Sequence, residues 1–272
     1  MQIFFLILLF IIGACFGSFL CCAARRLHLR STNHPLKSKR SICLSCHYKL
    51  KWYDNLPIIS WLILKGKCKK CGKKIGLAEL LSELGVAIAF LTSGLGMQIS
   101  GTTIGSLIAS QSPILWVNLL AILVFTLLLA FLAIYDGIYG ELSVQGLIAS
   151  IACAIVLVII REWGSTSIMQ DLLNVLYSVL ILGGTYLVLY LISKGKWVGD
   201  GDWLLGTAIG LALGHPWLAV NALFIANLTA CLVMAPIVKK THHKKIYFGP
   251  FMVVAFIIVY SFADFFFYAI GG

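Results

Sequence analysis

Long apolar blocks separated by short polar segments occupy most of the chain. Eight blocks stand out, at residues 3–19, 77–97, 113–135, 143–160, 171–192, 203–214, 216–238 and 250–268. A helix needs about 20 apolar residues to cross a bilayer, and most of these blocks approach or reach that length. The pattern predicts an all-α integral membrane protein with about eight transmembrane helices. The sixth block is short and rich in glycine, so we expect it to be tilted, re-entrant or sheltered by neighbouring helices.

The composition agrees with this pattern. Of the 272 residues, 60% are hydrophobic, and the mean hydropathy of +0.98 excludes a soluble globular domain. No positive charge precedes the first block, whereas Arg25 and Arg26 follow it closely. This order predicts a retained first span with its N-terminus outside, rather than a cleaved secretory signal.

The net charge of +11 is concentrated in one segment, because 14 of the 21 Lys and Arg residues lie between Arg25 and Lys74. If that segment is cytoplasmic and the chain crosses the membrane at every block, 20 of the 21 Lys and Arg residues fall on the cytoplasmic side, including those of segment 239–247. Arg161 alone then lies on the opposite side. Cytoplasmic loops carry such an excess of basic residues, so we predict both termini outside. Membrane lipids, anionic ones in particular, are the expected contact of the basic segment. Nucleic acid is not expected, since basic and aromatic residues form no stacking platform.

The polar segment 25–76 is the only stretch suited to an extramembrane domain. It contains two C-x2-C pairs, Cys43 with Cys46 and Cys68 with Cys71. Four thiolates on two tight turns can complete a tetrahedral shell, so we predict a structural zinc site. Disulfides and a redox-active pair are the alternatives. A reducing cytoplasm disfavours disulfides, and two matched pairs fit a closed metal shell better than a redox motif.

These features together predict three parts of the chain. A first transmembrane helix occupies residues 1–24 and a small cytoplasmic, zinc-ribbon-like domain occupies residues 25–76. A seven-helix membrane domain occupies residues 77–272. The zinc-binding part is therefore an insertion between the first two membrane helices.

Two acidic residues from distant parts of the chain are predicted to lie at the same membrane depth. Asp136 stands at the cytoplasmic end of the third block, and Asp202 stands at the start of the sixth, after Gly199 and Gly201. Two carboxylates that approach closely share one proton, so one can activate a water while the other polarises a carbonyl. The pair indicates aspartyl hydrolysis. The structural alternative makes Asp202 a helix N-cap and Asp136 a solvated charge, and we expect Asp200 to be a solvated neighbour.

Several motifs together resemble those of the type IV prepilin peptidases. They are Gly17-Ser18-Phe19-Leu20 followed by Arg25-Arg26, the cysteine pairs around Trp52-Tyr53-Asp54-Asn55-Leu56-Pro57 and Ser60-Trp61, Lys65-Gly66-Lys67-Cys68, and Gly199-x-Gly201-Asp202. The resemblance runs in order over essentially the whole chain. Its cysteine and Trp-Tyr-Asp-Asn parts are specific, whereas GxGD alone is a weak signal.

This resemblance implies a peptidase of the bacterial inner (cytoplasmic) membrane that removes the basic leader of type IV prepilin or pseudopilin substrates on the cytoplasmic side. The two catalytic aspartates of the family correspond to Asp136 and Asp202. Many members also methylate the new N-terminus with S-adenosylmethionine, an activity assigned to the N-terminal cytoplasmic region. S-adenosylmethionine is therefore an expected second cofactor beside structural Zn²⁺, with no binding residues identified.

Three departures from the family pattern bear on these implications. The proline-aspartate pair expected seven and eight residues after the first aspartate is Ser143-Val144 here, which leaves the geometry after Asp136 open. Ile75-Gly76-Leu77-Ala78 stands in place of the usual Arg-Tyr-Pro, and Cys21 replaces an asparagine. The last two changes lie in the region credited with methyl transfer, so that activity also remains open.

A non-enzymatic zinc-ribbon scaffold of a pilus or secretion assembly is the alternative from another class of protein. It would use the two aspartates as structural caps. A transporter with an acidic proton relay is disfavoured, because the binding residues of transporters lie near the bilayer midplane rather than at its edge. Cleavage of a prepilin that requires both aspartates would distinguish the peptidase from the scaffold.

Overall fold

The computed structural model describes residues 2–31, 42–43, 45–95, 113–163, 166–241 and 247–270. Within these residues every regular element is helical, and two isolated β-bridges accompany the helices. The all-α class is therefore confirmed. Parts of the predicted cytoplasmic segments, residues 32–41, 44 and 242–246, lie outside the described residues.

Among the described residues, six helices are long and apolar enough to cross a membrane. They are α1 (Gln2–Ser31), α3 (Leu77–Leu95), α5 (Pro113–Tyr139), α6 (Val144–Glu162), the continuous helix Ile168–Ser193 and α10 (Pro216–Thr241). Two more apolar helices, α9 (Asp202–Leu213) and α11 (Gly249–Ser261), are shorter. An α-helix of the length of α9 extends about 18 Å, less than the roughly 30 Å of a hydrocarbon core. A multi-pass membrane protein is confirmed, and the exact number of eight spans stays a prediction.

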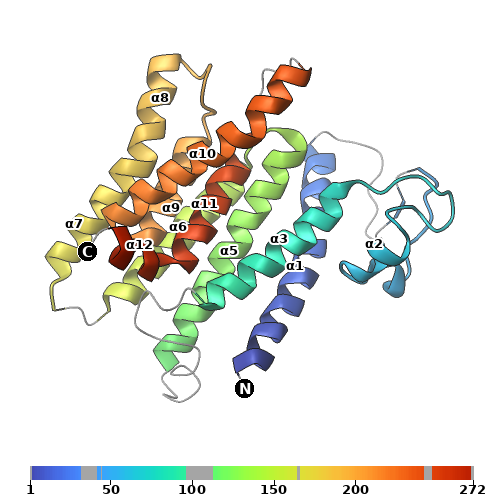
Figure 1. Cartoon of the computed structure of the whole chain (residues 1–272), viewed down its shortest axis with the longest axis horizontal. Coiled ribbons are helices and arrows are strands. Elements are labelled where there is room, and N and C mark those ends of the chain that lie inside the picture. The colour runs from blue at the N-terminus through green and yellow to red at the C-terminus, as the bar shows by residue number, and fades with distance from the viewer. Residues whose placement is uncertain are drawn as a thin grey trace. The chain divides into compact units, whose positions relative to one another are not determined.

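The chain divides into two compact units, Met1–Leu91 and Thr92–Gly272. The first unit contains α1, most of α3 and, between them, a small insertion with two short helices, η1 (Trp52–Asn55) and α2 (Ile59–Ile63). In the second unit, the helix Ile168–Ser193 consists of α7 (Ile168–Val179), the π-helical turn η3 (Leu180–Gly184) and α8 (Thr185–Ser193). Figure 1 labels most of these elements.

In the first unit, two glycines of α1 allow close packing against α3. A methyl group at Gly13 would lie 2.8 Å from the Cα of Ala87, and one at Gly17 would lie 2.7 Å from the Cα of Glu83. The two glycines are four residues apart and so lie on one face of the helix. This small-xxx-small arrangement brings backbones together in lipid, where close packing rather than the hydrophobic effect holds helices together.

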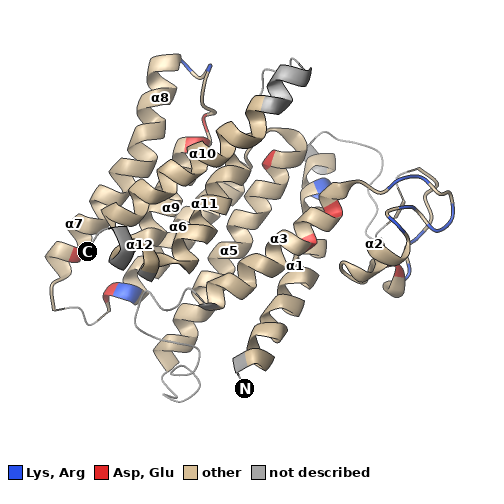
Figure 2. Cartoon of the chain, viewed as in Figure 1, with Lys and Arg blue, Asp and Glu red and all other residues tan. Residues whose placement is uncertain are grey.

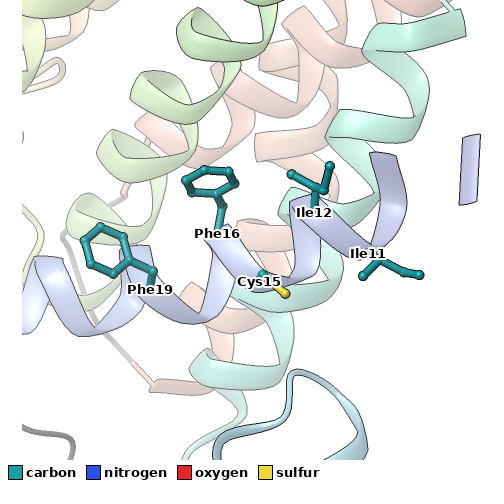
Figure 3. Close-up of a pocket in the computed structure, with 5 residues that line it drawn as sticks. All are labelled: Ile11, Ile12, Cys15, Phe16 and Phe19. Carbon is teal, nitrogen blue, oxygen red and sulfur yellow. The ribbon is translucent and has the colours of Figure 1, made fainter. Parts of the chain in front are cut away.

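One face of α1 carries an open apolar hollow. Its lining residues, drawn as sticks in Figure 3, are Ile11, Ile12, Cys15, Phe16 and Phe19. A helix that spans a membrane satisfies its backbone internally and can present such side chains to an apolar environment. The hollow therefore agrees with α1 as a membrane-spanning helix.

In the second unit, the short helix α9 is sheltered by its neighbours. A methyl group at Gly210 would lie 2.9 Å from the Cα of Val179, and one at Gly206 would lie 3.1 Å from the carbonyl oxygen of Leu182. Both contacts are made with the helix that contains η3. Glycine thus lets α9 approach a neighbouring backbone closely, and most of its side chains are buried.

The last apolar block, expected as a single span over residues 250–268, forms two helices. α11 ends at Ser261 and α12 (Ala263–Ile270) follows. Phe262 between them leaves the helical region, with φ of −115° and ψ of 29°, while its N–H still bonds to the carbonyl of Ile258. The expected single helix is therefore two helices, although apolar residues continue across the interruption.

The charged residues of the second unit lie at helix ends and in loops, and the helix middles carry none (Figure 2). Arg161, at the end of α6, donates from Nη1 to the carbonyl of Ala212 at 3.1 Å. Ala212 lies in the last turn of α9, where the helix dipole favours a cation. This contact gives a structural role to Arg161, which the predicted topology leaves alone on the outer side of the membrane.

We expect Gly17→Ala to destabilise the packing of α1 against α3, because the new methyl group would have no room beside the backbone of Glu83. Overpacking of this kind costs about 1–3 kcal/mol. Thermal unfolding of the purified full chain in detergent should therefore give a lower Tm for this variant.

Gly85→Ala is the matched control in the same unit. A methyl group at Gly85 meets no atom within 4 Å, and alanine is favoured over glycine in a helix by about 1 kcal/mol. Its Tm should equal or exceed that of the unmodified protein. An unchanged Tm for Gly17→Ala would contradict the close packing.

Candidate functional site

Asp202 is the first residue of α9, and the loop before it holds its carboxylate. Its Oδ2 accepts a hydrogen bond of 2.9 Å from the backbone N–H of Gly199. Between them, Gly201 leaves room for Leu142, whose Cδ1 would lie 2.8 Å from a methyl group at that position. Asp202 is buried and Asp200 is exposed. The loop therefore directs one acid into the bundle and the other toward solvent.

Asp136 lies in the last turn of α5 and is also buried. Its Oδ2 accepts a hydrogen bond of 2.9 Å from the backbone N–H of Gly249, the first residue of α11. α5 ends directly afterwards at Gly140, which has a left-handed φ of +70°. The helix end and the start of α11 together enclose the carboxylate.

The fold brings these two acids to the same end of the second unit. The C-terminal turn of α5 carries Asp136, and the N-terminus of α9 carries Asp202. Leu142, in the turn that follows α5, lies against Gly201, the residue before Asp202. The arrangement thus contains two buried carboxylates, each with one hydrogen bond of 2.9 Å from a glycine N–H. Sequence analysis singled out both acids and Gly199, but nothing in the sequence pointed to Gly249.

Ser143 starts α6 where the family has a proline. Its hydroxyl oxygen accepts a hydrogen bond from the N–H of Gly146 at 3.4 Å, which makes Ser143 the N-cap. A serine N-cap satisfies one of the N–H groups that a helix leaves unpaired at its start. The geometry after Asp136, which the sequence left open, is therefore a short turn followed by a capped helix.

The four cysteines form one cluster in the insertion of the first unit. Their sulfur atoms all lie within 4.8 Å of one another, with 3.8 Å between Cys43 and Cys71 and 4.0 Å between Cys46 and Cys68. In a tetrahedral site with Zn–S bonds of about 2.3 Å, the sulfur atoms are about 3.8 Å apart. The cluster could hold a metal ion, and its geometry is compatible with structural zinc.

Two turns with the same backbone geometry present the cysteines. In each turn, the N–H of the first cysteine, Cys43 or Cys68, donates to the carbonyl five residues later. The N–H four residues later donates back to the carbonyl of that cysteine. The donor residue is left-handed in both turns, with φ of +54° at His47 and +68° at Gly72. Gly72 is a visible signal of this turn in the sequence, whereas His47 is not.

The two thiols of the first cysteine pair differ in pKa. Hydrogen bonds from the backbone of Cys46 and Ser45 lower the pKa of Cys43 to about 6. A backbone hydrogen bond from Tyr48 lowers the pKa of Cys46, but desolvation and the three neighbouring thiols outweigh it and raise that pKa to about 11. Clustered thiolates repel one another, and a bound divalent cation would remove that repulsion.

Asp54 connects the Trp-Tyr-Asp-Asn motif to both turns. Its Oδ2 accepts hydrogen bonds of 3.2 Å from the hydroxyl of Tyr48 and from the N–H of Lys51. Its Oδ1 lies 3.9 Å from the Nζ of Lys69, within the second cysteine pair. Asp54 is buried, so these contacts fix the motif against the cluster. Sequence analysis used the motif only as a family signature.

Two glutamates of α3 bind other parts of the first unit, one in α1 and one in the insertion. The Nη2 of Arg25 lies 2.6 Å from the Oε1 of Glu79. The buried Oε2 of Glu83 accepts a hydrogen bond of 2.6 Å from the N–H of Ile58. Ile58 has φ of +63°, an unusual conformation for a β-branched residue, and this bond helps to hold it there. No local signal in the sequence marks Ile58.

The chain matches a known family and several curated proteins. Residues 11–97 match the family described as Bacterial Peptidase A24 N-terminal domain. The prepilin leader peptidase/N-methyltransferase of Vibrio cholerae is 25% identical over 268 residues, which cover 96% of this chain and 98% of that protein. A protein of the same name from Klebsiella pneumoniae is 29% identical over 209 residues, covering 76% and 84%. One from Myxococcus xanthus is 37% identical over 86 residues, covering 32% and 25%.

No solved structure matches the chain. The matched family segment contains all four cysteines and ends beyond α3, so it covers the described part of the insertion. The alignment with the Vibrio cholerae protein continues through the second unit, where both buried aspartates lie. The resemblance of this chain to the type IV prepilin peptidases is therefore confirmed.

Proposed function

We propose that this protein removes the leader peptide of type IV prepilin-like proteins by aspartyl hydrolysis, with Asp136 and Asp202 as the catalytic pair. The observation that carries the proposal is the burial of both carboxylates at one end of the second unit, each held by a hydrogen bond from a backbone N–H. The relatives named as prepilin leader peptidases supply the substrate class. Prepilins or pseudopilins are the expected substrates.

The chemistry follows from a pair that shares one proton, since two neighbouring buried carboxylates cannot both ionise without a large penalty. The ionised carboxylate takes a proton from water as the water oxygen attacks the scissile carbonyl carbon. The protonated carboxyl group donates its proton to the carbonyl oxygen. When the tetrahedral intermediate collapses, the C–N bond breaks and the amine nitrogen takes the proton that the first carboxylate received from water. A hydroxyl of the intermediate returns its proton to the other carboxylate, so the pair again holds one proton. Water is the nucleophile, so no acyl-enzyme forms.

In this proposal the site faces the cytoplasm across the bacterial inner membrane, and both termini lie outside. Lys194 and Lys196 follow α8 near the loop that precedes Asp202, whereas Arg161 contacts the opposite end of α9. Basic residues favour the cytoplasmic side of a membrane, which supports this orientation. A basic leader would reach the carboxylates from the side on which prepilins are made.

We assign structural Zn²⁺ to Cys43, Cys46, Cys68 and Cys71, within a cytoplasmic insertion of residues 25–76. Methylation of the new N-terminus with S-adenosylmethionine is a second proposed activity, supported by the names of the relatives. No residue is assigned to that cofactor. The alternative is a zinc-ribbon scaffold without catalysis, and a cleavage assay separates it from the peptidase.

Asp202→Asn and Asp136→Asn should each lower leader cleavage by at least about 100-fold, because an amide cannot transfer the proton and one acid–base group typically contributes that much. The assay is the mobility shift of a prepilin incubated with the purified full chain in detergent. Asp200→Asn is the matched control and should keep its activity, since Asp200 is exposed. Retained cleavage by either of the first two variants, with normal insertion of all three, would overturn the assignment.

The metal assignment predicts one zinc ion per chain in the purified protein. Cys71→Ser should lose the metal, because three thiolates no longer close the tetrahedral shell. Cys153→Ser should keep it, since Cys153 lies in α6 outside the cluster. Inductively coupled plasma mass spectrometry of the three proteins gives the measurement. Equal zinc in all three, or none in the unmodified protein, would sink the assignment.

A further inference from the structure

The two buried aspartates share one pattern of hydrogen bonding. In each case Oδ2 accepts a bond of 2.9 Å from the backbone N–H of a glycine. For Asp202 the donor is Gly199, three residues away in the GxGD motif. For Asp136 the donor is Gly249, which is 113 residues away. The second donor lies outside every motif that the sequence analysis used.

We propose that Gly249 is a positioning residue for Asp136 and does for it what Gly199 does for Asp202. This inference rests on the proposed peptidase function, in which Asp136 is one of the two catalytic groups. Gly249 itself touches no reacting atom. It acts by fixing where the Asp136 carboxylate points.

Glycine is needed at position 249 because there is no room for a side chain beside the Asp136 carboxylate. A methyl group on Gly249 would lie 2.8 Å from the Oδ2 of Asp136 and 3.4 Å from its Cβ and Cγ. Asp136 is buried, so its carboxylate cannot move aside into solvent. Gly249 is not among the described glycines with positive φ, so its backbone conformation does not by itself require glycine. The close approach to the carboxylate does.

The position of Gly249 in α11 makes its N–H available. It is the first residue of the helix, where N–H groups have no partner within the helix. Pro250 follows, and it is well suited to the first turn because its fixed φ matches a helix and it has no N–H to satisfy. The partial positive charge of the helix N-terminus also favours a carboxylate at this place.

The segment that carries Gly249 packs against Tyr186 of α8. The ring of Phe248 lies 5.3 Å from the ring of Tyr186, a residue that is only 2% exposed. The hydroxyl of Tyr186 accepts a hydrogen bond of 3.2 Å from the Nδ2 of Asn227 in α10. Tyr186 also packs beside Gly206, one turn after Asp202 in α9. The same buried tyrosine therefore contacts the helix of one aspartate and the segment that holds the other.

The test compares Gly249→Ala with Gly137→Ala in the purified full chain. Gly137 is next to Asp136, but a methyl group there would have only Pro250 within 4 Å, at 3.8 Å. A displacement of about 1 Å in a catalytic group can cost about 100-fold in rate. We expect Gly249→Ala to lower kcat for leader cleavage by about that factor with KM within about twofold, whereas Gly137→Ala should stay within about twofold on both. Unchanged kcat in Gly249→Ala would overturn the proposal.

A double-mutant cycle on Tm separates positioning from a general folding defect. Gly249→Ala should lower Tm in the unmodified protein but much less in Asp136→Ala, because removal of the carboxylate leaves room for the methyl group. An equal Tm loss in both backgrounds would overturn the proposal. If Gly249→Ala fails to fold, folding of the double variant supports it and failure of the double variant overturns it.

The cycle is independent of catalysis and therefore separates the two proposals. Retained cleavage by Asp136→Asn would end the peptidase assignment of that residue, and with it the catalytic meaning of Gly249. The Tm cycle would still report whether Gly249 and Asp136 form the contact. Loss of the coupling with intact dependence on Asp136 would instead end only the proposal for Gly249.

Discussion

A carboxylate inside an apolar helix bundle needs hydrogen-bond donors in place of the water that it loses. Without them, burial of the charged group is strongly unfavourable. Here the donors are backbone N–H groups of two glycines, Gly199 before α9 and Gly249 at the start of α11. The N–H of Gly249 is free because a helix leaves its first N–H groups unpaired, whereas the N–H of Gly199 belongs to the loop before α9. Each acid therefore receives its hydrogen bond at or just before the start of a helix, and both lie at one end of the second unit.

Glycine also allows the helices to pack against one another, although lipid is as apolar as their side chains. Close approach of backbones supplies packing contacts in place of a hydrophobic driving force. In the first unit Gly13 and Gly17 allow this approach, and in the second Gly206 and Gly210 do so for α9. The short helix α9 can carry Asp202 because its neighbours cover it. Packing of this kind and the placement of the acid are therefore linked.

The insertion of the first unit is stabilised in a different way, because a segment of its size cannot build a large apolar core. Below about 70–80 residues a single apolar core supplies little stability, and small domains often add a metal site or disulfides. Four sulfur atoms within 4.8 Å of one another provide the metal-binding alternative. Asp54 and Glu83 then attach the Trp-Tyr-Asp-Asn motif and the strained Ile58 to the cluster and to α3. Buried carboxylates thus accept hydrogen bonds from backbone N–H groups in both units, beside the cysteine cluster in one and at glycines in the other.

The membrane class, the helical content and the cysteine cluster could be predicted from the sequence, because each follows from a local pattern. Bilayer thickness sets the length of an apolar block, and a C-x2-C pair forms within one turn. Other features depend on partners that are far apart in the chain. Nothing in the sequence near Gly249 indicates that it donates to Asp136, and nothing near Ile58 indicates that it donates to Glu83. Apolar length and charge are properties of the residues themselves, whereas a hydrogen bond between distant segments exists only once packing has brought its donor and acceptor together.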